Sequence, residues 1–149
     1  MRVGPFVSLA ALAIACSGSG VAGSVGTGEL TVTATTDRAS VRPGEQLHIA
    51  VEVTNNSTSS RELRFATGCQ TDFEFVDDKG NVVRTSQQGC FQSLTQRTLA
   101  AGESFSGQHI WTRGPTDPPQ LAAGNYQLRG VLLTMGNPAR SAPIPVSLP

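Results

Sequence analysis

Hydrophobic and polar residues alternate along several short stretches of this chain. Residues 29–35 follow that pattern, and residues 47–53 place an apolar side chain at every second position: Leu47, Ile49, Val51 and Val53. Successive side chains of a β-strand point to opposite faces, so a period of two predicts strands with one buried face. We expect these four side chains to face a core and His48 to point outward.

Turn-forming residues separate the alternating stretches. Residues 42–45 contain Pro followed by Gly, and residues 55–58 are Asn, Asn, Ser and Thr, whose short polar side chains bond to nearby backbone. Residues 77–81 carry the Asp and Gly of a hairpin tip, between strands that we expect over 73–76 and 82–84. The Pro-rich stretch 113–120 predicts a long surface loop, because Pro lacks the donor that a central strand needs.

The spacing of these signals predicts an all-β domain. Further strands are expected over 62–65, 97–99, 105–111, 127–133 and 142–148. Short strands at this spacing are typical of an antiparallel β-sandwich of about eight strands. Leu63 and Phe65 are expected to point inward, and Trp111 is expected to pack in the core.

Composition and charge narrow the class of protein. The 149 residues are enough for one domain, and Lys plus Arg equals Asp plus Glu at 11 each. A chain without net charge, and without a run of basic residues, does not attract nucleic acid. We therefore expect no nucleic-acid partner.

The N-terminal residues have the features of an export signal. Residues 5–15 form an apolar run that is too short to span a bilayer, and Cys16 follows directly. This arrangement resembles the bacterial lipoprotein pattern, which predicts a signal peptide over 1–15, a lipid on Cys16 and a Gly/Ser-rich tether over 16–28, with the sandwich over 29–149. Ordinary signal cleavage near Ala22 and a buried N-terminal helix are the alternatives.

Export changes the interpretation of the other two cysteines. In an oxidising compartment Cys69 and Cys90 are expected to form a disulfide, which would close a loop of about 20 residues worth on the order of 3 kcal/mol. A metal site and two free thiols are the alternatives, but two Cys without nearby His rarely hold a structural zinc.

Catalytic and metal-binding motifs are missing from the sequence. Catalysis needs a nucleophile, a base and a group that orients the base, and we place both His48 and His109 on the outward faces of their strands. The sequence contains no Gly-x-Ser-x-Gly, His-Glu-x-x-His or phosphate-binding Gly loop. Asp72, Asp77 and Asp78 are expected to be solvated turn carboxylates rather than calcium ligands. We expect no enzyme activity, cofactor, metal or small-molecule substrate.

Several segments, in this order, resemble the intracellular proteinase inhibitor family of the BsuPI type. They cover most of residues 47–133 and comprise 51–57, 63–68, 72–84, Ser86, 91–94, 99–104, Trp111 and 123–128. The resemblance implies an immunoglobulin-like form of the sandwich. This chain has Thr71 and Thr85 where the family often has aromatic residues, and Cys69 and Cys90 lie beside these two places. A bridge is therefore expected to replace aromatic packing there.

The resemblance also implies a function through protein binding. We expect a non-enzymatic protein-binding module of the bacterial cell envelope, exported and lipid-anchored to a membrane, with a proteinase as the partner that the family implies. The alternative is a structural or adaptor lipoprotein without inhibitory activity, in which the bridge only stabilises a small core. The candidate binding loops are 67–71, 85–96 and 113–122, and the first two contain the candidate contact residues Thr67, Gly68, Gln70, Thr71, Gln88, Phe91 and Gln92.

Overall fold

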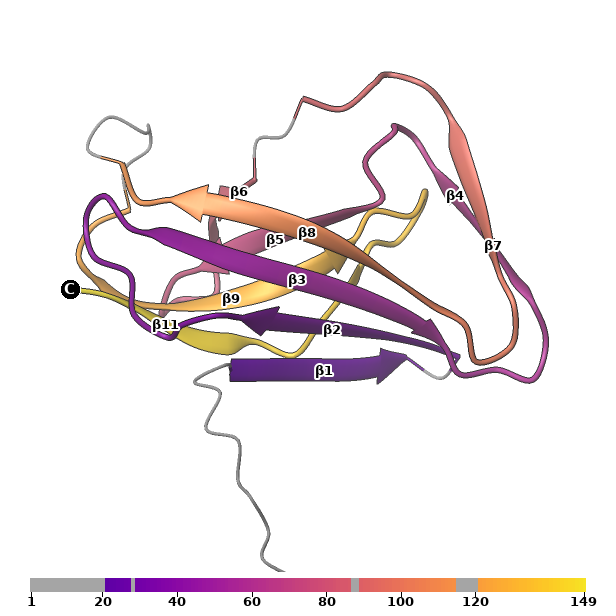
Figure 1. The fold of residues 1–149 in the computed structure, drawn as a ribbon, viewed down its shortest axis with the longest axis horizontal. Helices are drawn as coiled ribbons and strands as arrows, with labels where there is room; N and C mark the ends of the chain where they lie inside the picture. Colours follow the sequence, from indigo (N-terminus) through magenta and orange to yellow (C-terminus); the bar gives the residue numbers. More distant parts are fainter. Residues whose placement is uncertain (1–20, 28, 87–88, 115–120) are drawn as a thin grey trace, which may run out of the picture.

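The computed structural model describes residues 21–27, 29–86, 89–114 and 121–149. This part of the chain forms eleven β-strands and no helix (Figure 1). The strands are β1 Val21–Thr27, β2 Leu30–Thr36, β3 Gln46–Asn55, β4 Arg61–Phe65, β5 Thr71–Val76, β6 Val82–Thr85, β7 Thr95–Leu99, β8 Ser104–Thr112, β9 Gly124–Leu132, β10 Ala139–Arg140 and β11 Ile144–Leu148. Within these residues no helix has the length and apolar character needed to cross a membrane.

The first layer of the sandwich is an antiparallel sheet in the order β1-β2-β3-β8. The register places Ile49 of β3 opposite His109 of β8, and Leu47 opposite Trp111. Opposite residues share a face of the sheet, so the buried face of β3 defines the buried face of β8. All four apolar side chains of β3 are fully buried, as the alternation predicted, whereas His48 is exposed.

The second layer is built around β9. Strand β5 pairs with one edge of β9, and β11 and β10 pair with successive parts of its other edge. Strand β6 extends the sheet beyond β5 and forms the predicted hairpin with it. Ser141 lies between β10 and β11, where its backbone N–H donates to the carbonyl of Gly130 and its hydroxyl accepts from the N–H of Gly130.

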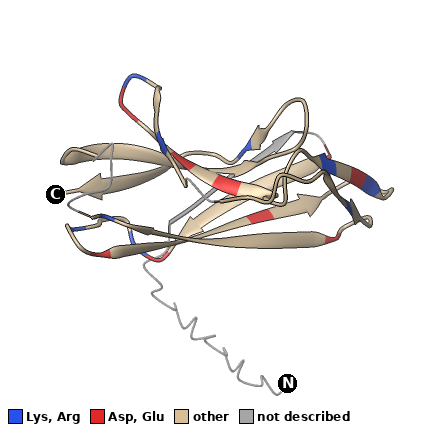
Figure 2. Cartoon of the chain, turned by 90° about the horizontal axis from the view of Figure 1, so that it is seen from above, with Lys and Arg blue, Asp and Glu red and all other residues tan. Residues whose placement is uncertain are grey.

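The two sheets face each other and enclose the core. Gly130 of β9 lies against Val51 and Ala34, and a β-carbon added to Gly130 would approach them to 3.0–3.1 Å. A glycine is thus needed at this close contact between the two layers. Nearby, the rings of Phe75 and Trp111 lie 4.7 Å apart between centroids, and this confirms the core position predicted for Trp111. Figure 2 shows the two layers from above, with basic and acidic residues intermingled.

Strands β4 and β7 form a separate antiparallel pair at one end of the sandwich (Figure 1). Leu63 and Phe65 of β4 are buried in the common core, as expected. Asn55 ties this pair to the first sheet, because its buried Nδ2 lies within 3.1 Å of the carbonyl oxygens of Ser59, Leu99 and Ala100. Its Oδ1 accepts hydrogen bonds from Ser57, as in the predicted turn.

The structure confirms the all-β, immunoglobulin-like antiparallel sandwich and adds two strands to those expected. Strand β10 has only two residues, and β1 lies in residues that we assigned to the Gly/Ser-rich tether. That assignment is wrong for residues 21–27, which pair with β2 along its whole length. The signal segment, Cys16, Gln88 and residues 115–120 lie outside the described residues.

Candidate functional site

A disulfide joins the two loops that leave β4 and β6. Cys69 and Cys90 are bonded, with their Cα atoms 5.4 Å apart and a separation of 21 positions in sequence. This confirms the pairing expected for an exported chain. The bond fixes residues 66–70 against residues 89–94, which otherwise have no common strand.

Hydrogen bonds hold the same two loops together beside the disulfide. The carbonyl oxygen of Phe91 accepts from the N–H of Gly68 and from the N–H of Ser93, both at 2.9 Å. The Thr95 hydroxyl donates to the carbonyl of Thr67 at 2.8 Å, and the N–H of Cys69 donates to the Thr67 hydroxyl at 3.2 Å. The backbone of the Phe91 loop is therefore held at Cys90, at Phe91 and at Thr95.

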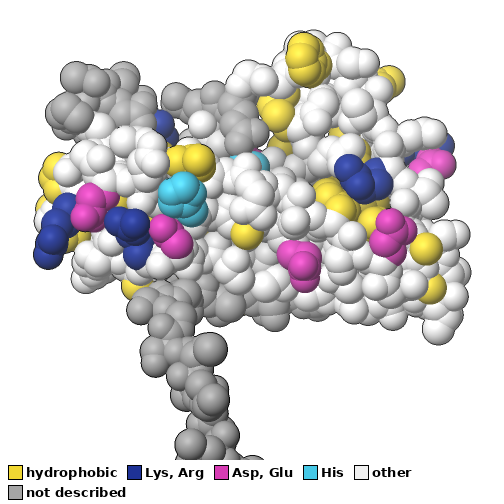
Figure 3. Space-filling view, in the orientation of Figure 1, with side chains coloured by type: hydrophobic (Ala, Val, Ile, Leu, Met, Phe, Trp, Pro, Cys, Tyr) yellow, Lys and Arg dark blue, Asp and Glu magenta, His cyan; other side chains and the backbone are white. Residues whose placement is uncertain are grey.

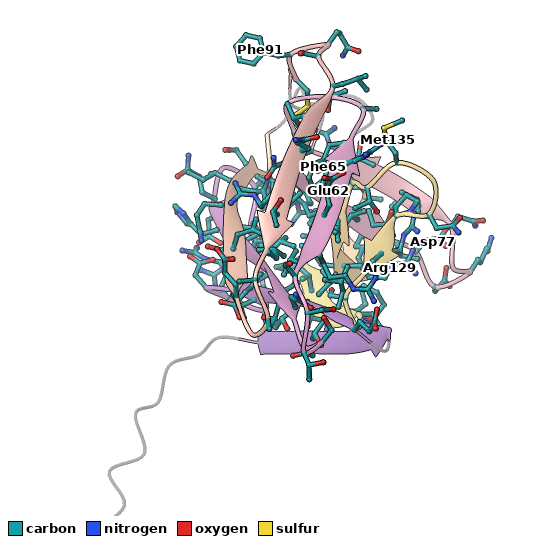
Figure 4. The ribbon with its side chains drawn as sticks, turned by 90° about the vertical axis from the view of Figure 1, so that its right-hand side faces the viewer. Glu62, Phe65, Asp77, Phe91, Arg129 and Met135 are labelled. Carbon is teal, nitrogen blue, oxygen red and sulfur yellow. A yellow bond between two sulfur atoms is a disulfide. The ribbon has the colours of Figure 1, made fainter. Side chains whose placement is uncertain are left out.

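Three exposed apolar side chains lie at this end of the molecule, and we call them the end patch: Phe91, Leu94 and Met135. They are 87%, 75% and 55% exposed. Leu94 and Met135 line a groove of about 420 Å³ together with Arg64, Phe65, Thr95 and Gln96. In Figure 4 the Phe91 ring points away from the ribbon at the tip of the loop, while Met135 lies lower, near Phe65.

The end patch is assembled from distant parts of the sequence. Met135 belongs to the β9–β10 connection, which is fixed here because its N–H donates to the carbonyl of Arg64 at 2.8 Å. The space-filling view shows hydrophobic side chains at this upper edge of the molecule (Figure 3). Sequence reasoning placed Phe91 and Leu94 in a candidate loop but named only Phe91 as a contact residue, and it did not assign Met135 to a binding surface.

A second, polar depression lies beside Cys69 of the disulfide. Its lining includes Gln70, Thr71, Arg97, Phe105 and His109. Arg97 lies over the Phe105 ring, with 4.4 Å between its Cζ and the ring centroid, and its Nε donates to Gln70 Oε1 at 2.7 Å. The Gln70 side chain is thereby held against β7.

His109 is buried, so the prediction that it points outward is wrong. Its Nε2 lies 3.0 Å from the Thr71 hydroxyl, and its ring packs edge-on against Phe73. Burial lowers the pKa of His109 below its ordinary value, and the nearby Asp72 carboxylate opposes this effect only in part. The prediction failed because Ile110, the apolar neighbour of His109, is 59% exposed, while the buried Trp111 shares the face of His109.

The candidate contact residues differ in their accessibility. Gly68, Phe91 and Gln92 are exposed, Thr67 and Gln70 are partly buried, and Thr71 is only 7% exposed. All of these residues lie within two positions of Cys69 or Cys90 in sequence. The Thr71 side chain is directed to His109. Partner contacts at this end are therefore available mainly from the two loop tips.

No metal-ligand cluster is found in the described ranges. No three His, Cys, Asp or Glu side chains there lie close enough to hold an ion. His48 and His109 lie on opposite faces of the first sheet, because His48 is paired with Ile110. Asp77 accepts hydrogen bonds from the N–H groups of Lys79 and Asn81, and its bonds to Asn81 lower the pKa of Asp77. It is a turn carboxylate, as expected.

Comparison with solved structures gives matches at low sequence identity. The sporulation control protein Spo0M from Bacillus subtilis matches with a TM-score of 0.51 at 16% identity, over 81% of this chain and 49% of Spo0M. The β-glucosidase EmGH1 from Erythrobacter marinus matches with a TM-score of 0.46 at 14% identity, over 88% of this chain and 15% of the enzyme. A β-glucosidase from Listeria innocua in complex with isofagomine matches with a TM-score of 0.47 at 13% identity, over 80% of this chain and 16% of the enzyme. This chain thus spans less than a fifth of either enzyme and about half of Spo0M, and the likeness to Spo0M concerns the fold alone.

Comparison with protein families gives a match that covers most of the described chain. No curated protein matches the sequence. The family model BsuPI, described as intracellular proteinase inhibitor, matches residues 33–137. This range includes β3 to β9, the disulfide and the end patch. The chain therefore belongs to the BsuPI, or intracellular proteinase inhibitor, family.

Proposed function

We propose that this protein binds a proteinase through the end patch and inhibits it without any catalysis of its own. Membership of a proteinase inhibitor family supports a proteinase as the partner. The observation that carries the choice of surface is the exposure of Phe91 and Leu94 on a loop that is fixed by a disulfide. Large exposed apolar side chains that lie together are typical of protein-binding sites.

The fixed loop favours tight binding. A flexible loop loses conformational freedom when it docks, and this loss lowers affinity. The bridge between Cys69 and Cys90, together with the hydrogen bonds to the Phe91 carbonyl, restricts the loop before any partner binds. Phe91 and Leu94 can then make apolar contacts with little further ordering of the backbone.

The proposed place of action is the cell envelope. A disulfide persists in oxidising compartments and is rare in the cytosol, so the bridge supports export. The signal-like residues 1–15, followed by Cys16, support a lipid anchor at the membrane. In this proposal the inhibitor protects envelope proteins close to the membrane from which it extends.

Inhibition assays with matched variants test the proposed surface. Full-length protein is titrated against chymotrypsin, subtilisin and trypsin, and the inhibition constant is measured for wild type, for F91A/L94A and for I110A. Ile110 is the control because it is an exposed apolar residue on β8, away from the end patch. We expect F91A/L94A to weaken inhibition at least about tenfold, as for loss of a binding hot spot, and I110A to have no effect.

Two results would contradict the proposal. Full proteinase rates with wild type in all three assays would remove the inhibitor function and leave the adaptor alternative. Equal inhibition by wild type and F91A/L94A would place the binding surface elsewhere on the sandwich.

A further inference from the structure

We propose that Phe91 inserts its side chain into the specificity pocket of the proteinase, while its own peptide bond is withheld from the catalytic nucleophile. The inference rests on the proposed function and adds the binding mode. It implies an inhibitor that is selective for proteinases with an apolar pocket and that is not cleaved after Phe91.

The position of the Phe91 carbonyl supports a mode unlike that of a substrate. A proteinase attacks a carbonyl whose oxygen lies in the oxyanion hole, where enzyme donors approach it to about 2.7–3.1 Å. The Phe91 oxygen already accepts two hydrogen bonds, from the N–H groups of Gly68 and Ser93. A carbonyl oxygen has two lone pairs, so both are engaged within the inhibitor.

The backbone shape at Gln92 leads to the same conclusion. A hydrogen bond from the N–H of Ser93 to the carbonyl of Phe91 closes a three-residue turn around Gln92. An extended peptide, which proteins bind along its length through main-chain hydrogen bonds, contains no such turn. The bond between Phe91 and Gln92 is therefore bent inward in the free inhibitor.

Contacts with Gly68 keep this arrangement in place. A β-carbon added to Gly68 would lie 3.5 Å from the β-carbon of Phe91, so the two backbones are in close apposition. The adjacent Cys90 is covalently held to Cys69. Freeing the Phe91 carbonyl would require the two loops to separate at a point where a covalent bond joins them.

The Phe91 side chain remains available although its carbonyl is not. The ring is 87% exposed and points away from the body of the protein (Figure 4). An aromatic side chain fits the hydrophobic pocket of chymotrypsin and is not matched to the carboxylate in the pocket of trypsin. Leu94 and Met135 line the neighbouring groove and are suited to contacts beside that pocket.

Selectivity measurements with the full-length protein test the role of the side chain. Wild type should inhibit chymotrypsin and subtilisin more strongly than trypsin, and F91A should lose at least about tenfold against chymotrypsin. F91R should gain affinity for trypsin as it loses affinity for chymotrypsin, while the melting temperature stays that of wild type, since the side chain makes little contact with the core. If the selectivity of F91R equals that of wild type, the proposed anchor is wrong.

Mass spectrometry after prolonged incubation with chymotrypsin tests the withheld bond. We expect wild type to remain intact after Phe91, and C69S/C90S to be cut there, because its loops can separate. A wild-type complex that contains chain cleaved between Phe91 and Gln92 would overturn the binding mode while leaving the inhibitor function in place. Absence of inhibition of all three enzymes by wild type would instead refute the proposed function and this inference with it.

Discussion

Removal of the bridge in C69S/C90S should destabilise the protein by about 3 kcal/mol. The bond joins residues 21 apart, and the chain-entropy model gives roughly this value for a loop of that length. The cost arises mainly in the unfolded state, because the bridge restricts the unfolded chain, whereas the native core is held together by buried apolar side chains. For a domain of this size the melting temperature should fall by about 10 °C.

Thermal unfolding followed by circular dichroism measures this effect. Wild type under oxidising conditions is compared with C69S/C90S and with wild type in the presence of a reductant. The reduced wild type should melt close to the double variant, and the reductant should not change the double variant. An unchanged melting temperature in C69S/C90S would show that the bridge does not stabilise the fold, and the reasoning from loop closure would fail.

Three further predictions concern other parts of the chain. G107A should lower stability by about 1–3 kcal/mol in chemical unfolding, because the new β-carbon would overlap the Thr71 hydroxyl, whereas strand propensity alone predicts a gain. Burial lowers the pKa of His109 below its ordinary 6.5, so the stability that comes from the neutral imidazole is complete above that value and is lost as the pH falls. H109Q should therefore lose less stability than wild type between about pH 7.5 and 5.5. C16S should move the protein from the membrane fraction to the soluble fraction, and continued retention at the membrane would contradict the lipid anchor.

The alternation of residues was sufficient to predict the buried faces of most strands. In β3 the period of two separates four apolar side chains from His48, Ala50 and Glu52, so only one face can be buried. In β8 the signal conflicts, because Ile110 and Trp111 are adjacent and only one can point inward. The register with β3 decides which of the two points inward, since it places Ile110 opposite the exposed His48. Such pairing is not visible in β8 alone.

Strand β1 could not be predicted from composition. Its residues 21–27 include two glycines, one alanine and only two valines, which is a weak strand signal. The strand forms against the open edge of β2, whose backbone groups need partners. The need for glycine at Gly107 and Gly130 likewise depends on contacts between elements that are distant in sequence.

The disulfide was predictable, whereas the end patch was predictable only in part. The expectation of export and an even number of remaining cysteines led to the Cys69–Cys90 pairing. Phe91 lay in an expected binding loop, but its exposure follows from the bonds that turn its carbonyl inward. Met135 joins Leu94 because a backbone hydrogen bond fixes it beside β4, and no short-range pattern indicates that contact.

Order in the Phe91 loop has a different physical origin from order in the sandwich. The core is formed mainly by apolar side chains of β2, β3, β5, β8, β9 and β11, which are held by the pairing of the strands and by burial rather than by the bridge. The loop buries little, since Phe91 and Leu94 are both mostly exposed, so its conformation depends on the bridge and a few hydrogen bonds. Reduction should therefore leave the strands folded at moderate temperature while it releases the Phe91 carbonyl. The proposed binding surface is thus more sensitive to the redox state of its compartment than the fold that carries it.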